Sequence, residues 1–295
     1  MKHNRIITLL IIVLMVYSAS AQLDLSKSKL EIEKVGKDIY LFVQQTNITN
    51  PSSIVYSSPE LSILIDPGYK QMQLSVKDSI NALNGGSIKF IMTSHFHLDH
   101  VQAMENYYNN TTILLSSNQQ KNISNMDIKN IISSDDKYHL KLGQEELEIH
   151  SFPNTSGHTD SDALFFFKQA NVLIVGDYLF QDMYPRIDLK GGGGSIDGYF
   201  KNIDYILSLA DNNTKIIPGH TSFKEVKKRY LSKKEYSLHI NKIKESISKI
   251  NAMKTKGLSI EEALKQGLPE KFKYLSEGAK YVSQDKWITF IYNNL

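Results

Sequence analysis

The sequence predicts an α/β fold in which two β-sheets pack face to face and helices cover the outside. Three observations lead to this prediction: short β-rich segments recur along the chain, helical patterns are interspersed among them, and polar residues stand where strands run into loops. The chain has 295 residues, of which 41% are hydrophobic, and no linker rich in Pro, Gly or Ser divides it. A single domain is therefore expected over residues 22–295.

The first half of the chain is expected to contain paired strands followed by alternating helices and strands. Residues 30–45 and 52–69 are strand–turn–strand patterns with β-branched and aromatic residues, and Asp66-Pro67-Gly68 ends the second. Residues 71–86 have helical spacing and stop at Gly85-Gly86. The segments that follow are a buried strand at 88–94, a helix at 100–108, a strand at 111–117 and a short helix at 118–126.

The second half continues the alternation and ends in helices. Three strands are expected at 145–153, 162–169 and 171–177, an amphipathic helix at 195–210 and a last strand at 214–220. From about residue 224 a helical extension with many lysines is expected to run to the end of the chain. Gly191 to Gly194 form a flexible loop rather than a phosphate cradle, since no Gly-Lys-Ser/Thr follows.

Residues 1–21 have the pattern of a secretory signal peptide. Lys2 and Arg5 precede an apolar run, Ile6 to Tyr17, which ends in the small residues Ala19-Ser20-Ala21. The run is short for a bilayer span, which needs about 20 residues. Cleavage after Ala21 would give an exported protein, periplasmic or secreted, with no membrane segment.

Composition restricts the chemistry of the mature chain. The net charge of +3 falls to +1 when Lys2 and Arg5 are removed, which gives no support to nucleic-acid binding. The chain has no cysteine, so a disulfide, a thiolate ligand and a thiolate nucleophile are all excluded. A metal site must therefore consist of His, Asp and Glu.

Histidines concentrate at the predicted strand ends. The chain has 9 histidines, and His95, His97 and His100 fall within the six residues HFHLDH directly after a buried strand. His158 and His220 each follow a glycine at a later strand–loop junction, and Asp177 follows a glycine at another. Glycine permits the backbone to turn sharply there. His139, His150 and His239 lie in ordinary strand or helix contexts and are expected to be structural.

The spacing of these residues predicts two adjacent metal positions. Residues two apart in an extended loop point to the same side, so His95 and His97 are expected to bind one ion together with His158. Asp99, His100 and His220 are expected to bind a second ion, and Asp177 is expected to bridge the two. Nitrogen and oxygen ligands without thiolate suit Zn²⁺, but also Fe²⁺, Mn²⁺ or cobalt.

The pattern His95-x-His97-x-Asp99-His100, followed by His158, Asp177 and His220, resembles the metallo-β-lactamase-fold hydrolase superfamily. The resemblance runs from about residue 30 to about residue 222. It implies a four-layer αββα sandwich, assigns the same three ligands to each ion, and makes Asp177 the bridge. It also implies that Asp66, which ends an early strand, supports the ligands without binding metal.

The resemblance also narrows the function. Asp177 and the lack of cysteine are more similar to the glyoxalase II, lactonase and ester or thioester hydrolase branches than to the true zinc β-lactamases. His97 stands where oxygen-reducing diiron relatives have Glu, and the insertion and basic surface of nuclease relatives are absent. The helical tail resembles that of exported members of the superfamily.

The expected function is a dinuclear zinc hydrolase that uses a metal-bridging hydroxide to cleave an ester, lactone, thioester or similar carbonyl bond of a small molecule. Asp99 is expected to transfer protons besides binding metal, and Tyr184 is a candidate oxyanion donor. The alternatives are a β-lactamase, a non-catalytic exported metal-binding protein and an iron oxidoreductase.

Overall fold

The computed structural model describes residues 24–83, 85–107, 111–135, 137–152, 155–277 and 282–295. The predicted signal peptide, residues 1–21, lies outside the described residues, so export remains a prediction.

A seven-stranded sheet is formed by the first half of the chain. Its strands follow one another in sequence order: β1 (Lys29–Gly36), β2 (Ile39–Gln45), β3 (Ser52–Ser57), β4 (Ser62–Ile65), β5 (Ile88–Met92), β6 (Thr112–Leu115) and β7 (Ile131–Ser133). The strands β1 to β4 are antiparallel, whereas β4 to β7 are parallel. The carboxyl ends of β4 and β5 therefore meet at one edge of the sheet.

A five-stranded sheet is formed by the second half. Its order is β12 (Lys215–Ile217), β11 (Val172–Ile174), β10 (Ala163–Phe167), β9 (Glu145–Ser151) and β8 (Tyr138–Leu142). The strand β12 is parallel to β11, and the remaining pairs are antiparallel. The carboxyl ends of β11 and β12 consequently lie together, as those of β4 and β5 do in the other sheet.

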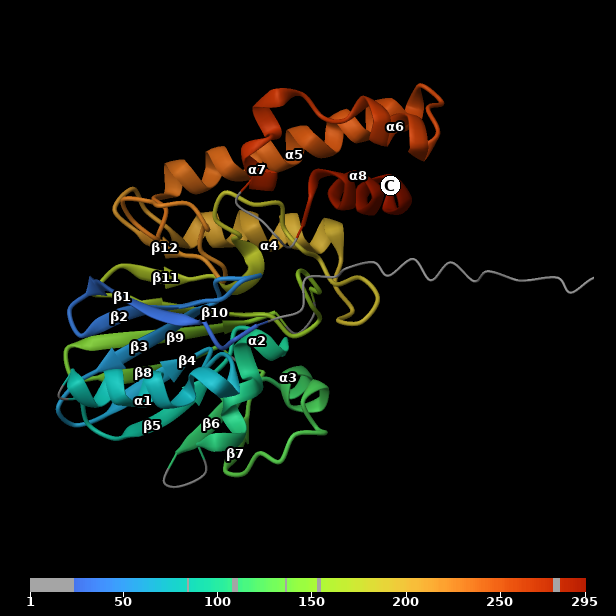
Figure 1. The fold of residues 1–295 in the computed structure, drawn as a ribbon. Helices are drawn as coiled ribbons and strands as arrows, with labels where there is room; N and C mark the ends of the chain where they lie inside the picture. Colours follow the sequence, from blue (N-terminus) through green and yellow to red (C-terminus); the bar gives the residue numbers. More distant parts are fainter. Residues whose placement is uncertain (1–23, 84, 108–110, 136, 153–154, 278–281) are drawn as a thin grey trace, which may run out of the picture.

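Helices cover the outer faces of both sheets (Figure 1). The first group contains η1 (Lys70–Met72), α1 (Gln73–Ala82), α2 (Leu98–Val101), η2 (Gln102–Asn106) and α3 (Ser117–Asn122). The second contains η3 (Gly176–Tyr178), α4 (Ile196–Leu209), α5 (Lys233–Thr255), α6 (Ile260–Gln266), η4 (Glu270–Phe272), α7 (Tyr274–Glu277) and α8 (Gln284–Asn294). In Figure 1, α1 lies against the seven-stranded sheet, and α4 with the C-terminal helices lies above the five-stranded sheet.

Alternating side chains of the strands divide the core into layers. On β10, Phe165 and Phe167 point between the two sheets, where they join Leu41 and Ile63 of the other sheet. Leu164 and Phe166 point to the opposite face and pack with residues of α4 and α5. Because both faces of both sheets are covered by apolar side chains, the predicted αββα sandwich is confirmed.

Two details differ from the sequence prediction. Bounds were predicted for no element between residues 127 and 144, yet β7 and β8 lie there as the edge strands of the two sheets. The C-terminal helices begin at Lys233 rather than near residue 224, because Ser232 caps α5 in a capping box with Glu235.

In the described part of the chain, no helix combines the length and apolar character that crossing a bilayer requires.

The C-terminal helices form a core of their own around Trp287. This side chain is fully buried, stacks on Tyr184 with ring centroids 5.3 Å apart, and donates a hydrogen bond from Nε1 to Ser246 Oγ at 2.9 Å. Phe200 of α4 packs against the same group of residues. The C-terminal helices are thus attached to the sandwich through α4.

We expect Trp287→Ala to lower the free energy of unfolding by about 3–5 kcal/mol, because it removes a large buried ring and leaves a cavity. Chemical denaturation followed by circular dichroism would measure the change. Leu238→Ala is the matched control, since Leu238 is an exposed residue of α5 and should change stability by less than about 0.5 kcal/mol. A loss below about 1 kcal/mol for Trp287→Ala would contradict the importance of this core.

Candidate metal centre

Residues from both sheets meet at one edge of the sandwich. The expected ligands stand after β5 (His95 and His97), within α2 (Asp99 and His100), between β9 and β10 (His158), in η3 after β11 (Asp177) and after β12 (His220). They form two groups of mutually close ligand atoms: His95, His97, His158 and Asp177 in one, and Asp99, His100 and His220 in the other. The structure therefore brings together all the predicted ligands.

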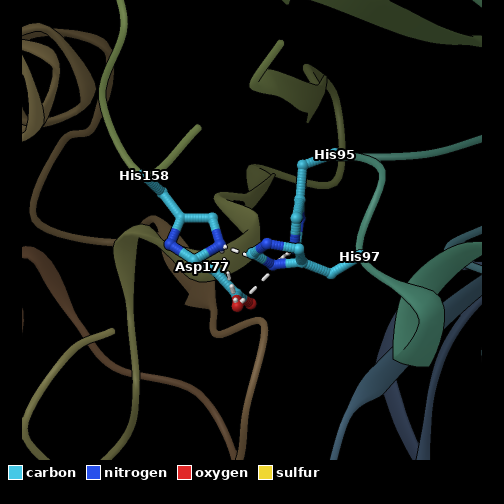
Figure 2. A group of neighbouring side chains, drawn as sticks. All are labelled: His95, His97, His158 and Asp177. Carbon is cyan, nitrogen blue, oxygen red and sulfur yellow. Dashed lines mark hydrogen bonds and ion pairs between the residues drawn. The ribbon is translucent and has the colours of Figure 1, made fainter. Parts of the chain in front are cut away.

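Three imidazoles converge in the first group. His97 Nδ1 lies 3.0 Å from His95 Nε2 and 3.1 Å from His158 Nε2. Figure 2 shows the three rings facing one another above the Asp177 carboxylate. His95 and His97, two residues apart, thus point to the same side of the loop, as expected.

In each ring, the nitrogen that points away from the other two rings makes a hydrogen bond, and this bond determines which nitrogen carries the proton. His158 Nδ1 donates to the carbonyl oxygen of Arg186 at 2.7 Å, and His97 Nε2 donates to the Asp188 carboxylate at 3.0 Å. His95 Nδ1 lies 3.0 Å from Ser94 Oγ, which itself donates to Asp66 and therefore accepts from the ring. Since a neutral imidazole has one N–H, the nitrogens that face one another carry lone pairs.

Lone pairs at such distances repel one another unless a cation lies between them. Ligands at the 2.0–2.1 Å of a Zn–N bond in a tetrahedral site are about 3.3–3.4 Å apart. The observed separations of 3.0 and 3.1 Å between the imidazole nitrogens approach that spacing. The residues of this chain therefore fit a divalent metal ion.

Asp177 links the two groups. Its Oδ2 lies 3.6 Å from His95 Nε2, 3.3 Å from His158 Nε2 and 3.4 Å from His220 Nε2. Its Oδ1 is 3.4 Å from His100 Nε2 and is buried without a hydrogen-bond partner among the described residues. A buried carboxylate oxygen without a donor is costly, and a metal ion would satisfy it.

The second group is completed by Asp99 and His220. Asp99 Oδ2 lies 3.4 Å from His220 Nε2, and His220 Nε2 lies 3.5 Å from His100 Nε2. The ring of His220 stacks on Phe180 at 4.9 Å, which holds its plane. Asp99 is the most exposed of these residues, with 21% of its side chain accessible, so this group is the more open to solvent.

Asp66 supports the ligands as the family resemblance implied. Its Oδ1 accepts from the backbone N–H of Ser94 at 2.6 Å and from Thr93 Oγ1 at 2.9 Å. Its Oδ2 lies 3.1 Å from His100 Nδ1. Asp66 thereby orients the loop that carries His95 and the ring of His100.

Burial keeps the three imidazoles of the first group in the neutral form. Burial lowers the pKa of His95 well below its usual value, and it lowers the pKa of His158 to about 3. Burial also lowers the pKa of His97. These rings are therefore neutral at pH 7, and neutral imidazole is the form that binds metal.

The second group shows the opposite electrostatics. Burial opposes a charge on His100, but the carboxylates of Asp177 and Asp66 outweigh it and raise the pKa of His100 well above its usual value. Burial likewise opposes the charge on Asp177, yet the surrounding imidazoles, His220 first, hold the pKa of that carboxyl well below its usual range. An anion enclosed in this way requires positive charge beside it.

Two glycines shape the surroundings of Asp177: a Cβ on Gly176 would meet Ser94, and a Cβ on Gly219 would meet the Asp177 carboxylate itself. Gly176 has a φ of +51°, a left-handed conformation in which a side chain is strained. A Cβ on Gly219 would stand 2.1 Å from Asp177 Oδ1, so no larger residue fits. The glycine before His220 therefore serves close approach rather than the sharp turn that the sequence suggested.

Asp188 is a functional residue that the sequence analysis missed. Its Oδ2 accepts from His97 Nε2, and its Oδ1 accepts from the backbone N–H of Gly191 at 2.9 Å. The Gly191 to Gly194 segment therefore folds around Asp188 rather than forming an open loop. An aspartate three residues before a glycine run is a turn signal that would have drawn attention to it.

Tyr184 lies in the C-terminal core. Its ring is fully buried against Trp287, and its hydroxyl has no hydrogen-bond partner among the described residues. These surroundings are those of a packing residue and give no support to an oxyanion role, which stays a prediction. Tyr178 is also buried and donates to Asp162 Oδ2 at 2.6 Å, as a structural residue does.

Comparisons with known proteins agree with this geometry. Residues 47–220, which include every candidate ligand, match the model of the metallo-beta-lactamase superfamily. "Probable metallo-hydrolase YqgX" of Bacillus subtilis is 25% identical over 143 residues, which cover 44% of this chain and 67% of that protein.

Solved structures show the same fold. The metallo-beta-lactamase from Pontibacter korlensis has a TM-score of 0.60 at 15% identity, covering 71% of this chain and 96% of that one. The metallo-beta-lactamase IND-7 has a TM-score of 0.57 at 17% identity, covering 73% and 97%. The chain belongs to the metallo-beta-lactamase superfamily and is a metal-dependent hydrolase.

We expect Asp188→Ala to weaken metal binding about 10- to 100-fold, because His97 loses the acceptor that fixes its proton on Nε2. Asp188→Asn retains an acceptor oxygen and should weaken binding less. Competition with a chromogenic chelator would measure both affinities. Asp78→Ala, a change at an exposed site on α1, is the control. Equal affinities for Asp188→Ala and the wild type would contradict the role of Asp188.

Proposed function

We propose that this member of the superfamily binds two divalent ions, preferentially zinc, and hydrolyses an ester, lactone or thioester bond of a small molecule. The position of Asp177 between the two ligand groups is the observation that carries this proposal. Its Oδ2 approaches His95 and His158, and its Oδ1 approaches His100. A carboxylate placed in this way can bridge two ions, as the two-metal mechanism requires.

The donor set supports zinc as the metal. The first group offers three neutral imidazoles, which is the ligand set of catalytic zinc sites that keep one position open. The second offers two imidazoles and a carboxylate, and no thiolate is available in a chain without cysteine. Fe²⁺ and Mn²⁺ accept the same ligand types and remain alternatives to be tested by metal exchange.

Bound divalent ions would supply a lowered pKa for coordinated water, from about 16 to about 7, and would polarise a substrate carbonyl. The protein residues supply position and proton transfer. Asp66, Asp188 and the Arg186 carbonyl hold the rings of His100, His97 and His158. The Asp99 carboxylate, which is partly exposed beside His220, would accept a proton from the attacking water and pass it to the leaving group.

The negative charge of Asp177 bears on which substrate bond is cleaved. Asp177 adds negative charge between the metal positions, which favours attack on a carbonyl whose leaving group is a stable oxygen or sulfur anion. When a β-lactam ring opens, the leaving group is an amine anion, and its negative charge needs more stabilisation by the second ion. The solved structures reported above are named metallo-beta-lactamases, so β-lactam hydrolysis is the alternative function. The likeness to them at 15–17% identity concerns the fold alone.

We expect the catalytic centre to retain about two zinc ions in the wild-type chain and at most about one in Asp177→Ala, because the shared ligand is lost. Activity of the variant should fall at least about 100-fold, more than for loss of a supporting residue. Metal analysis after dialysis, together with initial rates, would test both. Asp197→Ala, a change of an exposed carboxylate on α4, is the control. Two firmly bound ions in Asp177→Ala would sink the bridging role.

We expect the zinc-loaded enzyme to hydrolyse at least one ester, lactone or thioester with a higher kcat/KM than nitrocefin. Initial rates on a panel of these substrates, measured alongside Asp177→Ala as the blank, would decide the matter. Faster turnover of nitrocefin than of every other substrate would establish the β-lactamase alternative. No turnover of any substrate by a fully loaded protein would favour a metal-binding protein without catalysis.

A further inference from the structure

A second group of histidine and glutamate side chains lies on the outer face of the five-stranded sheet. His139 is on β8, and Glu146, Glu148 and His150 are on β9. From the sequence alone, His139 and His150 were expected to be ordinary structural residues. The structure corrects this expectation, because each of them contacts a glutamate of the group.

The strand register places the four side chains on one face. The strands β8 and β9 are antiparallel, with His139 directly opposite Glu148. Glu146, Glu148 and His150 alternate along β9, so they point to the same side of the sheet. The intervening residues Leu147 and Ile149 point into the core between the sheets. The positions of the four polar side chains are therefore set by rigid backbone.

Three of the side chains converge closely enough to share one ion. His139 Nδ1 lies 2.5 Å from Glu146 Oε1 and 3.9 Å from Glu148 Oε1. One ligand atom from each of the three lies within 4.8 Å of the others. His139 and Glu146 are 42% and 35% exposed, so their side chains have the freedom to settle around an ion. The solvent around them would complete its coordination.

The third ligand, Glu148, is oriented by a hydrogen bond from His150. Glu148 Oε2 accepts from His150 Nε2 at 3.0 Å, and His150 Nδ1 lies 2.8 Å from the hydroxyl of Tyr205 on α4. His150 is buried, with only 3% of its surface exposed, so the ring that supports Glu148 is held by packing as well as by Tyr205. Glu148 Oε1 is the oxygen that this arrangement leaves facing His139. Such support behind a ligand is typical of metal sites.

Two lysines compete for the same carboxylate. Lys137 Nζ is 3.6 Å from Glu148 Oε2, and Lys168 Nζ is 3.7 Å from Glu148 Oε1. Both ammonium groups are 40% exposed or more and stand beyond hydrogen-bond distance. Pairs of this kind contribute about 0–1 kcal/mol. A divalent ion bound by one imidazole and two carboxylates would displace them readily.

We propose that His139, Glu146 and Glu148 form a separate binding site for a divalent transition-metal ion such as Zn²⁺. The site shares no residue with the catalytic centre, and it joins the edge strand β8 to β9. One imidazole and two carboxylates suit zinc, as well as copper(II) and nickel(II). The Tyr205 hydroxyl and His150 are positioning residues that orient Glu148.

Equilibrium dialysis of the mature protein against increasing Zn²⁺, followed by metal analysis, tests the proposal. Wild type should bind one equivalent more than His139→Ala/Glu146→Gln. Because the result is a difference between two proteins with the same catalytic residues, it does not depend on how many ions the catalytic centre binds. Glu60→Gln, an exposed change elsewhere, is the control and should retain the additional equivalent.

Two further variants separate a metal site from an ion-pair network. Tyr205→Phe should weaken the additional equivalent about tenfold through loss of support for His150. Lys168→Ala should tighten it roughly two- to fivefold, because a competing cation is removed. A network without metal binding gives no such opposite responses.

The proposal is overturned if wild type and His139→Ala/Glu146→Gln bind equal zinc up to about 1 mM, a concentration that would reveal even weak sites. It is also overturned if Glu60→Gln loses the additional equivalent.

Discussion

A buried carboxylate surrounded by imidazoles is the interaction on which the rest of this structure depends. Asp177 is only 4% exposed, and four histidine nitrogens stand 3.3–3.6 Å from its oxygens. An ionised carboxylate in such a place is tolerable only if positive charge stands next to it. Those histidines are the candidate ligands of a cation and come from both sheets, so the place for a balancing cation exists only when the sheets are packed together. Gly219 is the further condition, since it leaves the space that the carboxylate occupies.

The parts of the site that a local pattern specifies were predictable from the sequence. HFHLDH follows a buried strand, so its spacing fixed which side chains point together. His158, Asp177 and His220 follow glycines at strand ends, and the parallel pairing of β11 with β12 brings two of those ends side by side. The sandwich was predictable for the same reason, because period-two and helical patterns survive in each segment. Asp66 required the family resemblance, since its contact with His100 has no local signal.

The remaining features depend on packing between distant segments. Asp188 holds His97 across 91 positions of sequence, and no spacing rule connects them. The edge strands β7 and β8 are only three and five residues long, so their apolar residues did not distinguish them from loop. Tyr184 follows Asp177 closely in sequence, yet its ring packs against Trp287 of α8. In each case tertiary contacts decided a position that local propensity left open.

The long sequence separation within the metal centre also governs how the protein matures. His100 and His220, whose ring nitrogens are 3.5 Å apart, are separated by 120 positions, and the intervening chain builds the whole second sheet. Contacts of such high order form late in folding, because the loop must close before they yield any stabilisation. An unfolded or half-made chain offers an ion only the local HFHLDH segment. Full metal capture is therefore coupled to completion of the fold, so ions are needed when the last contacts form rather than while the chain is being synthesised.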